Sequence, residues 1–405
     1  MAVNYATIFS PVIDQALAVG MTSELMQADA ADVKYEGGNS VKVATITAPG
    51  LGDYSRTSGY KSGTMSVDWT EYTFEKDRAV EINIDKYDLD ETNFVDSVAN
   101  AMKVMKEQNS DPEIDAYRYA KVFSAVAATA LAATPAPMEA YTPAAATILS
   151  KLQNDMTEVQ DIAGETAPIV CYMSRKAYGV LTQSSELSKQ LQVLETNVNG
   201  VMTKVKGIDD MPIIPVPSLR MRTAYTFNSG ESSFGFAAAA TAGRINWIIA
   251  PRGSLKGVIK GDDVKVFDPP NNIKYSGWLI QLRLYHTLIV MSEKITSMRI
   301  SFQPGTSALS VTVAAGAAAG TKATATAGTG NALRYALTDA SIGGTALKDV
   351  HISELEDLSS SDYTSGADIA AATAGKYLTV VAYNTTTGLI ATSYEKLLAS
   401  GDIYS

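Results

Sequence analysis

The sequence has few of the side chains that most catalytic and metal sites require. Its 405 residues include only one cysteine and two histidines. Cys171 lies in an apolar run, so a disulfide within the chain is excluded and we expect a small buried side chain in a reducing compartment. The sequence also has no HExxH motif, no pair of CxxC motifs and no GxxxxGK(S/T) phosphate loop. We therefore expect no enzyme activity, no metal site and no cofactor.

Basic residues are outnumbered by acidic ones, with 33 Lys and Arg against 43 Asp and Glu and a net charge of −10. Tight nucleic-acid binding needs clustered Lys and Arg, so the charge balance argues against a surface built for it and leaves weak or transient contact with DNA open. Long hydrophobic runs are also missing, because the most apolar segments, 125–133 and 234–242, are far shorter than the roughly 18–20 residues of a membrane span. The first 20 residues lack the basic and apolar pattern of a signal peptide. We expect a soluble protein that is made in the cytoplasm and has no membrane contact.

The segment 111–134 carries the strongest helical pattern. Asp111 suits an N-cap and Pro112 suits the first turn. Together with 90–108 it predicts a long helical spine that is interrupted once, at 109–112, and that ends before a Pro-rich stretch. The apolar residues that recur at helical spacing, and that we take as the core-facing residues of the spine, include Ile114, Tyr117 and Phe123.

Two segments precede the spine. Residues 1–33 have too little apolar surface to fold alone and are interpreted as an arm, with short helices at 12–18 and 21–26. Residues 34–85 predict strands at 41–46, 66–74 and 78–84, the first two joined by a polar tip at 48–63. Since an isolated hairpin is marginally stable, it must lean on this chain or on another copy. The candidate assembly residues at the tip are Tyr54, Arg56, Tyr60 and Lys61.

The residues after the spine predict a mixed α/β region at 135–263 and returning strands at 264–303. The expected helices lie at 142–160, after a Ser174 cap, at 184–194 and at 253–256. The expected strands lie at 169–173, at 211–217 as an edge strand because of its prolines, and at 245–250, 264–267, 278–291 and 298–302. The last three strands are candidates to pair with 78–84 and to cover the spine.

The composition shifts at about residue 304 to a segment rich in Ala, Thr, Gly and Ser. Short alternating runs separated by turns predict a β-sandwich of immunoglobulin-like type over 304–405. A low-complexity tail is the alternative, but Tyr335, Leu337 and Val380 are among the residues that supply a core. The expected strands lie at 310–313, 321–325, 333–337, 376–383 and 389–394.

The remaining polar clusters favour structural roles. Arg220 and Arg222 alternate with apolar residues, which indicates a strand with one basic face. The pairs Asp209–Asp210 and Asp262–Asp263 are interpreted as solvated turn residues, with a metal site as the alternative, and 354–357 as an exposed charged face. His286 lies within a strand, where a structural role is more common than a catalytic one.

The order of these parts, together with four motifs, resembles the major capsid proteins of tailed bacteriophages with the HK97 fold, in the type found in phages of Gram-positive bacteria. The similar segments are DPEIDAYRYAK at 111–121, GIDDMPIIPVP at 207–217, 245–251 with Lys256, and the strand from Trp278 to His286. In the last segment Thr287 stands where the family usually has Asp. The resemblance spans about residues 1–303.

The resemblance implies an α+β fold with an added all-β domain. Its parts are an N-terminal arm (1–33), an E-loop hairpin (34–85), a P-domain spine helix (86–134), an A-domain (135–263), returning P-domain strands (264–303) and an immunoglobulin-like surface domain (304–405). In this family the E-loop lies across a neighbouring subunit. Lys61 is not expected to form the covalent crosslink that one relative makes.

The implied function is a shell subunit. Pentamers and hexamers would close into an icosahedral head around double-stranded DNA, without sequence-specific binding, after assembly in the bacterial host cytoplasm with a portal and a separate scaffolding protein. Residues 304–405 would face outward as a surface decoration of unknown ligand, whose task is either to stabilise the shell at subunit junctions or to make weak contacts with glycans or a host surface. The alternatives are an encapsulin-like nanocompartment, which would contain a cargo enzyme instead of DNA, and an unrecognised hydrolase that uses His286.

Overall fold

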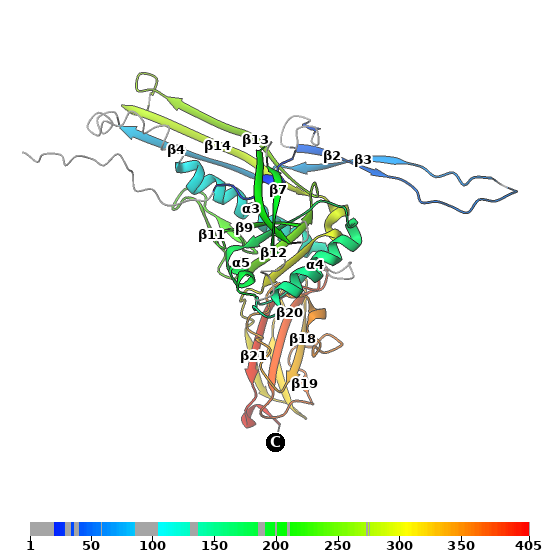
Figure 1. The fold of residues 1–405 in the computed structure, drawn as a ribbon. Helices are drawn as coiled ribbons and strands as arrows, with labels where there is room; N and C mark the ends of the chain where they lie inside the picture. Colours follow the sequence, from blue (N-terminus) through cyan, green and yellow to red (C-terminus); the bar gives the residue numbers. More distant parts are fainter. Residues whose placement is uncertain are drawn as a thin grey trace, which may run out of the picture.

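The computed structural model describes residues 20–28, 34–35, 40–57, 59–85, 104–129, 137–184, 191–198, 201–208, 211–272, 274 and 276–404. Figure 1 shows a central α/β body, a hairpin and a long sheet that extend from it in different directions, and a β-rich module at the C-terminal end. The predicted mixed α+β class is therefore confirmed.

The body is built on a seven-stranded sheet in the order β5-β15-β12-β6-β9-β8-β7. Its strands are β5 (Met138–Ala140), β15 (Arg299–Gln303), β12 (Arg244–Pro251), β6 (Ile169–Ser174), β9 (Met211–Val216), β8 (Val201–Ile208) and β7 (Leu191–Val198). Helix α3 (Asp111–Thr129) packs on one face, and helices α4 (Ile148–Ala163) and α5 (Arg175–Thr182) pack on the other.

The sequence of β6 explains this three-layer packing. Val170 and Tyr172 join the core beneath α3, whereas Ile169, Cys171 and Met173 join the core beneath α4 and α5. Because successive side chains of a strand point to opposite faces, a strand covered on both faces must be apolar throughout. Cys171 is a fully buried free thiol, as predicted, and burial raises its pKa.

The spine helix is continuous where the sequence predicted an interruption. Residues 104–105 are helical, a π-helical turn spans Lys106–Ser110, and α3 follows at once. Asp111 has α-helical dihedral angles (φ −62°, ψ −45°), so the predicted break at 109–112 and the predicted N-cap role of Asp111 are both wrong. Pro112 lacks an N–H donor, and the π turn before it changes the hydrogen-bond register that an uninterrupted α-helix would require there. The remaining parts of the predicted spine, 90–103 and 130–134, lie outside the described residues.

A long sheet and a hairpin extend from this body. The sheet has the order β13-β14-β4, from β13 (Leu255–Phe267), β14 (Gly277–Val290) and β4 (Lys76–Asp85), all antiparallel. The hairpin pairs β2 (Ser40–Thr47) with β3 (Ser66–Thr73), and β1 (Lys34–Tyr35) adds to β2. The predicted hairpin and the predicted pairing of 278–291 with 78–84 are confirmed.

Several local predictions were wrong. The strand at 298–302 pairs with β12 in the central sheet as β15, not with 78–84. The predicted helix at 253–256 is instead a turn that leads into β13. Asp262 and Asp263, which were predicted as turn residues, lie in β13 and pair with β14. Because β13 runs through residue 263, the predicted limit between the α/β region and the returning strands falls inside a strand.

Three further corrections concern the α/β region. Helix α4 begins at Ile148 because the Tyr141 hydroxyl holds the preceding turn through the hydroxyl of Thr147 (2.9 Å) and the backbone N–H of Ala144 (3.3 Å). Residues 191–194 of the predicted helix lie in β7, where pairing with β8 overrides the local pattern. Strand β9 lies inside the sheet between β6 and β8, so the prediction of an edge strand was wrong. In the described pairing β8 bonds only to Met211 and Pro212, so the missing N–H of Pro215 disrupts no hydrogen bond to β8.

The predicted β-rich module follows residue 304 and has its own core. Its two three-stranded antiparallel sheets are β16-β17-β19 and β18-β20-β21. The strands are β16 (Val311–Ala315), β17 (Thr321–Ala325), β18 (Asn331–Thr338), β19 (Asp368–Ile369), β20 (Tyr377–Asn384) and β21 (Ile390–Leu397). Five of the six match predicted segments, and the two-residue β19 was missed. A folded core excludes the low-complexity tail.

The module contacts the body through specific groups. The Ala140 backbone N–H donates to Glu354 Oε2 at 3.0 Å, and Leu389 joins the core beneath α3. Glu354 also closes a capping box on the short helix Ile352–Glu354, and its partial burial raises the pKa of its carboxyl. The predicted exposed face at 354–357 is therefore wrong for Glu354.

Candidate assembly surface

The β2–β3 hairpin presents an apolar face whose larger side chains are half or more exposed. Ala44 pairs with Trp69, and Ile46 pairs with Val67, so these four side chains share one face. Ile46 is 64% exposed and Trp69 is 52% exposed. At the other end of the hairpin, Val41, Val43 and Phe74 are buried against Val258 and Ile289 of the long sheet. The hairpin is thus packed against the long sheet at its base and exposed to solvent toward its tip.

The tip brings two of the predicted assembly residues together. The rings of Tyr54 and Tyr60 meet edge to face with centroids 5.1 Å apart, above a bridge between Ser55 and Gly59. Both tyrosines are exposed. Arg56 and Lys61 are also exposed. Their role in assembly stays a prediction.

The predicted spine residues face the protein core. Ile114, Tyr117 and Phe123 are all buried. Phe123 packs edge to face on Phe302 of β15, with centroids 5.2 Å apart. The Tyr117 hydroxyl donates to Glu75 Oε2 at 3.0 Å, and burial raises its pKa. These side chains hold the helix between the sheets, which is a structural role.

A buried charge cluster on α3, which the sequence reasoning missed, fixes the segment 20–28. Asp115 is fully buried and accepts hydrogen bonds from the Thr22 N–H (2.9 Å), the Thr22 hydroxyl (2.7 Å) and the Ser23 N–H (3.1 Å). Arg220 Nη1 donates to the same carboxylate at 2.9 Å and to the Gly20 carbonyl at 2.8 Å. Arg220 lies in a turn and is buried, so the predicted basic strand face is wrong.

Arg118 extends this cluster one helical turn further. Its guanidinium donates to the Ser23 carbonyl (3.0 Å), the Ser23 hydroxyl (3.1 Å) and Gln27 Oε1 (2.7 Å). A Cβ at Gly257 would lie 2.6 Å from this guanidinium, so a larger residue there would displace the guanidinium. The sequence signal was a polar pair, Asp115 and Arg118, at i and i+3 inside an apolar helical pattern.

His286 and Asp155 are two further buried titratable groups. His286 packs edge to face on Tyr117, with centroids 5.1 Å apart, and neither ring nitrogen has a hydrogen-bond partner among the residues that the structure describes. Burial, followed by the charges of Arg118, Lys76 and Arg78, lowers the pKa of His286 to about 3. Asp155 accepts from the Trp247 indole N–H at 2.8 Å, and burial raises its pKa to about 6 against the opposing effect of Lys151. A neutral, enclosed imidazole without a polar partner fits the predicted structural role of His286.

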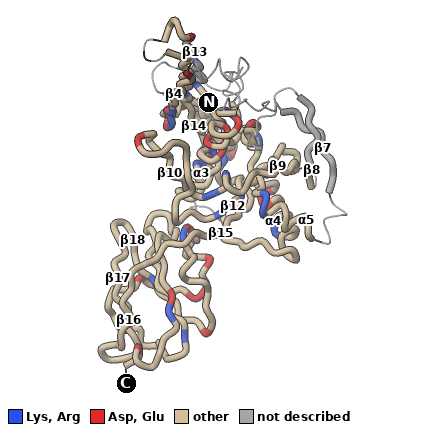
Figure 2. Tube along the Cα trace, turned by 90° about the vertical axis from the view of Figure 1, so that its left-hand side faces the viewer, with Lys and Arg blue, Asp and Glu red and all other residues tan. Residues whose placement is uncertain are grey.

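Positions of acidic and basic residues are interspersed along the described part of the chain (Figure 2). Within the described ranges no three His, Cys, Asp or Glu residues group as a metal site. No helix of the described chain is long and apolar enough to cross a membrane. Asp209 and Asp210 lie outside the described residues.

No protein-family model and no curated protein matches this sequence. Solved structures do match. A chain from the capsid structure of the cyanophage P-SCSP1u aligns with a TM-score of 0.51 and 11% identity, covering 75% of this chain and 94% of that one. Chains from the mature capsid of bacteriophage PhiM1 (TM-score 0.48, 13% identity, 73% and 91% covered) and from Mycobacterium phage Che8 (0.43, 11%, 74% and 98%) are also similar. The cyanophage match shows that this chain has a phage capsid fold.

Proposed function

We propose that this chain is the major capsid protein of a tailed phage and assembles with copies of itself into a closed head shell. The observation that carries the proposal is the exposed apolar face of the β2–β3 hairpin on a chain with a capsid fold. A monomer would leave Ile46, Val67 and Trp69 in water, whereas a neighbouring copy can cover them. Fully burying an apolar side chain of this size contributes roughly 1.5–3 kcal/mol.

The elements of the chain fit the parts of an HK97-type subunit. We assign the β2–β3 hairpin as the E-loop, and α3 with the β13-β14-β4 sheet as the P-domain. The central sheet with α4 and α5 is assigned as the A-domain, which meets its copies in pentamers and hexamers. Symmetric repetition of one chain then supplies every interface of an icosahedral shell.

The C-terminal module is assigned as an outward-facing, immunoglobulin-like decoration. Its two sheets around one core fit that class. Outward placement keeps it clear of the enclosed double-stranded DNA, and its ligand would be a glycan or host-surface group bound weakly. A net charge of −10 favours DNA that is enclosed without tight or sequence-specific binding. A portal and a separate scaffolding protein would act during assembly in the host cytoplasm.

A hairpin variant tests the proposal. Trp69→Asp places a charge on the apolar face, so we expect a folded chain by circular dichroism that no longer sediments as shells. Leu397→Asp is the matched control, because Leu397 is also a strand residue with an exposed apolar side chain, but in the module. The control should still assemble. Shells formed by Trp69→Asp as efficiently as by the wild type would contradict the proposed role of the hairpin.

A further inference from the structure

A pocket of about 460 Å³ opens at one end of the central sheet. Its walls come from the carboxyl ends of β6, β9 and β15, from the start of β12, and from the first turn of α5. Parallel strands bring their carboxyl ends to the same edge, where an α/β sheet commonly binds its ligand. Gln303, the last residue of β15, lines the pocket, so the opening lies beside the start of the C-terminal module.

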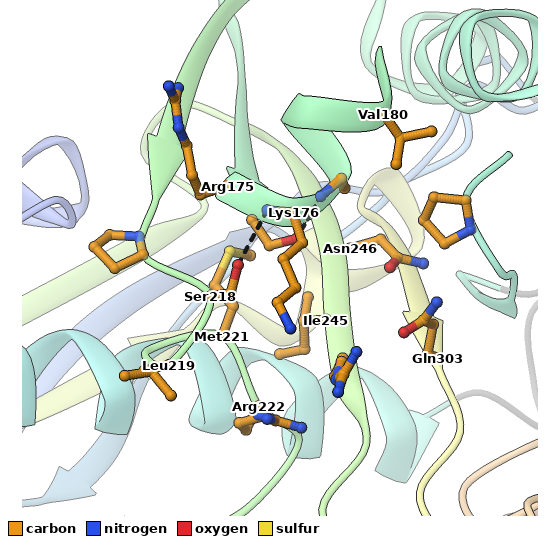
Figure 3. A pocket seen from close by; sticks show the side chains of 15 residues that line it. Arg175, Lys176, Val180, Ser218, Leu219, Met221, Arg222, Ile245, Asn246 and Gln303 are labelled. Carbon is orange, nitrogen blue, oxygen red and sulfur yellow. Dashed lines mark hydrogen bonds between the residues drawn. The ribbon is translucent and has the colours of Figure 1, made fainter. Parts of the chain in front are cut away.

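The pocket is lined by cations and by no acidic residue. Its basic residues are Arg175, Lys176, Arg222 and Arg244. In Figure 3 the side chains of Lys176 and Arg222 lie around the same space, whereas Arg175 points away and packs over the Tyr178 ring. No described carboxylate forms an ion pair with Lys176, Arg222 or Arg244, and Arg222 Nε is buried without a hydrogen-bond partner.

The remaining residues that line the pocket are largely apolar. Met221 and Ile245 are buried beneath the cations, and Leu219 at the rim is 77% exposed. Asn246 also lines the pocket, and its side-chain amide already donates to the Tyr141 carbonyl (2.7 Å) and to the Ser301 hydroxyl (3.2 Å). In such a pocket the methylene groups of an acidic side chain can pack against the apolar lining while its carboxylate meets the cations.

We propose that this pocket receives a carboxylate-bearing segment of a second copy of the chain. Uncompensated cations in a partly enclosed site favour an anion, and guanidinium groups bind carboxylates in a fixed geometry. The chain carries ten more acidic than basic residues, so each copy offers carboxylates in excess. The exposed Leu219 beside the cations adds the apolar contact that is typical of a protein interface.

The volume also favours a side chain over a nucleic-acid backbone. A concave pocket of about 460 Å³ encloses a few side chains of a protein segment, whereas the phosphates of duplex DNA lie on a convex surface. This inference rests on the proposed function, because a shell supplies the second copy at high local concentration. It adds the chemistry of one contact: Lys176, Arg222 and Arg244 on one copy and Asp or Glu on its neighbour.

Carbodiimide crosslinking of assembled particles tests the inference. The reagent joins the Lys176 amine to a carboxyl in direct contact as an amide, with loss of water. Particles assembled from mixed ¹⁴N- and ¹⁵N-labelled chains separate the two kinds of product by mass. We expect Lys176 in mixed-isotope crosslinks to one Asp or Glu. Lys376, whose Nζ lies 3.2 Å from Asp339 Oδ1 in the same chain, is the internal control and should give the same-isotope product.

The outcomes separate this inference from the proposed function. If the wild type forms no particles, both fail. Particles that give the Lys376 product but no mixed-isotope Lys176 product overturn the inference alone. Binding of inorganic phosphate that protects Lys176 in intact particles would assign a free anion, and would also overturn it. An Arg222→Gln variant should assemble into particles that dissociate at lower salt than the wild type, whereas Lys376→Gln particles should not.

Discussion

Removing the charge of Asp115 should detach the segment 20–28 from the spine and destabilise the chain. The carboxylate accepts four hydrogen bonds, from two groups of Thr22, from the Ser23 N–H and from Arg220. The Asp115→Asn variant keeps one acceptor oxygen and turns an NH₂ donor toward groups that are themselves donors. It also removes the charged partner that the buried Arg220 guanidinium has in Asp115.

The magnitude follows from the burial of the pair. Breaking a buried ion pair by removing one partner destabilises a protein by about 3–5 kcal/mol, because an uncompensated charge stays inside. The exposed pair of Asp77 and Arg283 (2.6 Å) is the matched control, since pairs at a surface contribute below about 1 kcal/mol. Asp77→Asn should therefore change stability little.

Urea unfolding of unassembled chains, followed by circular dichroism, measures both variants. Limited proteolysis should in addition show earlier cleavage near residue 20 in Asp115→Asn than in the wild type. An Asp115→Asn chain within 1 kcal/mol of the wild type, with unchanged cleavage, would refute the reasoning that this carboxylate holds the segment.

Three further predictions concern the spine and its surroundings. The His286 imidazole has a pKa of about 3 in the folded chain against 6.5 in the unfolded chain. Its contribution to the free energy of unfolding is therefore complete above pH 6.5, and roughly 5 kcal/mol is lost as the pH falls to 3. His286→Leu should remove this loss from the acid side of a plot of the free energy of unfolding against pH. The pH dependence from Asp155 has the opposite sign, because folding raises the pKa of its carboxyl from 3.8 to about 6. Its contribution to the free energy of unfolding is complete below pH 3.8, and roughly 3 kcal/mol is lost as the pH rises to 6. Asp155→Asn should remove this loss in the same pH series. Ala120→Pro breaks the ladder inside α3 at a cost of about 3 kcal/mol or more and should abolish particles in sedimentation; closed shells from this variant would count against the spine as a rigid beam.

The sequence predicted those elements whose pattern is set locally. The strands of the hairpin, β6, β12, β14 and most of the module carry clear period-2 or continuous apolar patterns, and the structure confirms them. The errors fall where long-range pairing decides. Residues 191–194 are drawn into a strand by β8, and the strand at 298–302 finds a partner in β12 instead of the long sheet. Local spacing contains no information on such partners.

The candidate surface was predicted in outline but not in its chemistry. A hairpin that needs a partner followed from the marginal stability of two strands. The shared face of Ile46, Val67 and Trp69 required the register of the pairing, which the sequence does not determine. The cluster around Asp115 joins Thr22 and Arg220, which lie 93 and 105 positions away in the sequence, so no spacing rule reveals Arg220 as its partner.

A cryo-electron microscopy reconstruction of the expressed wild-type protein tests the central claim most directly. The account predicts closed icosahedral shells in which the β2–β3 hairpin of each copy lies on a neighbour and the face around Trp69 is covered. Soluble monomers at assembly concentrations, or shells in which that face remains open to solvent, would contradict it.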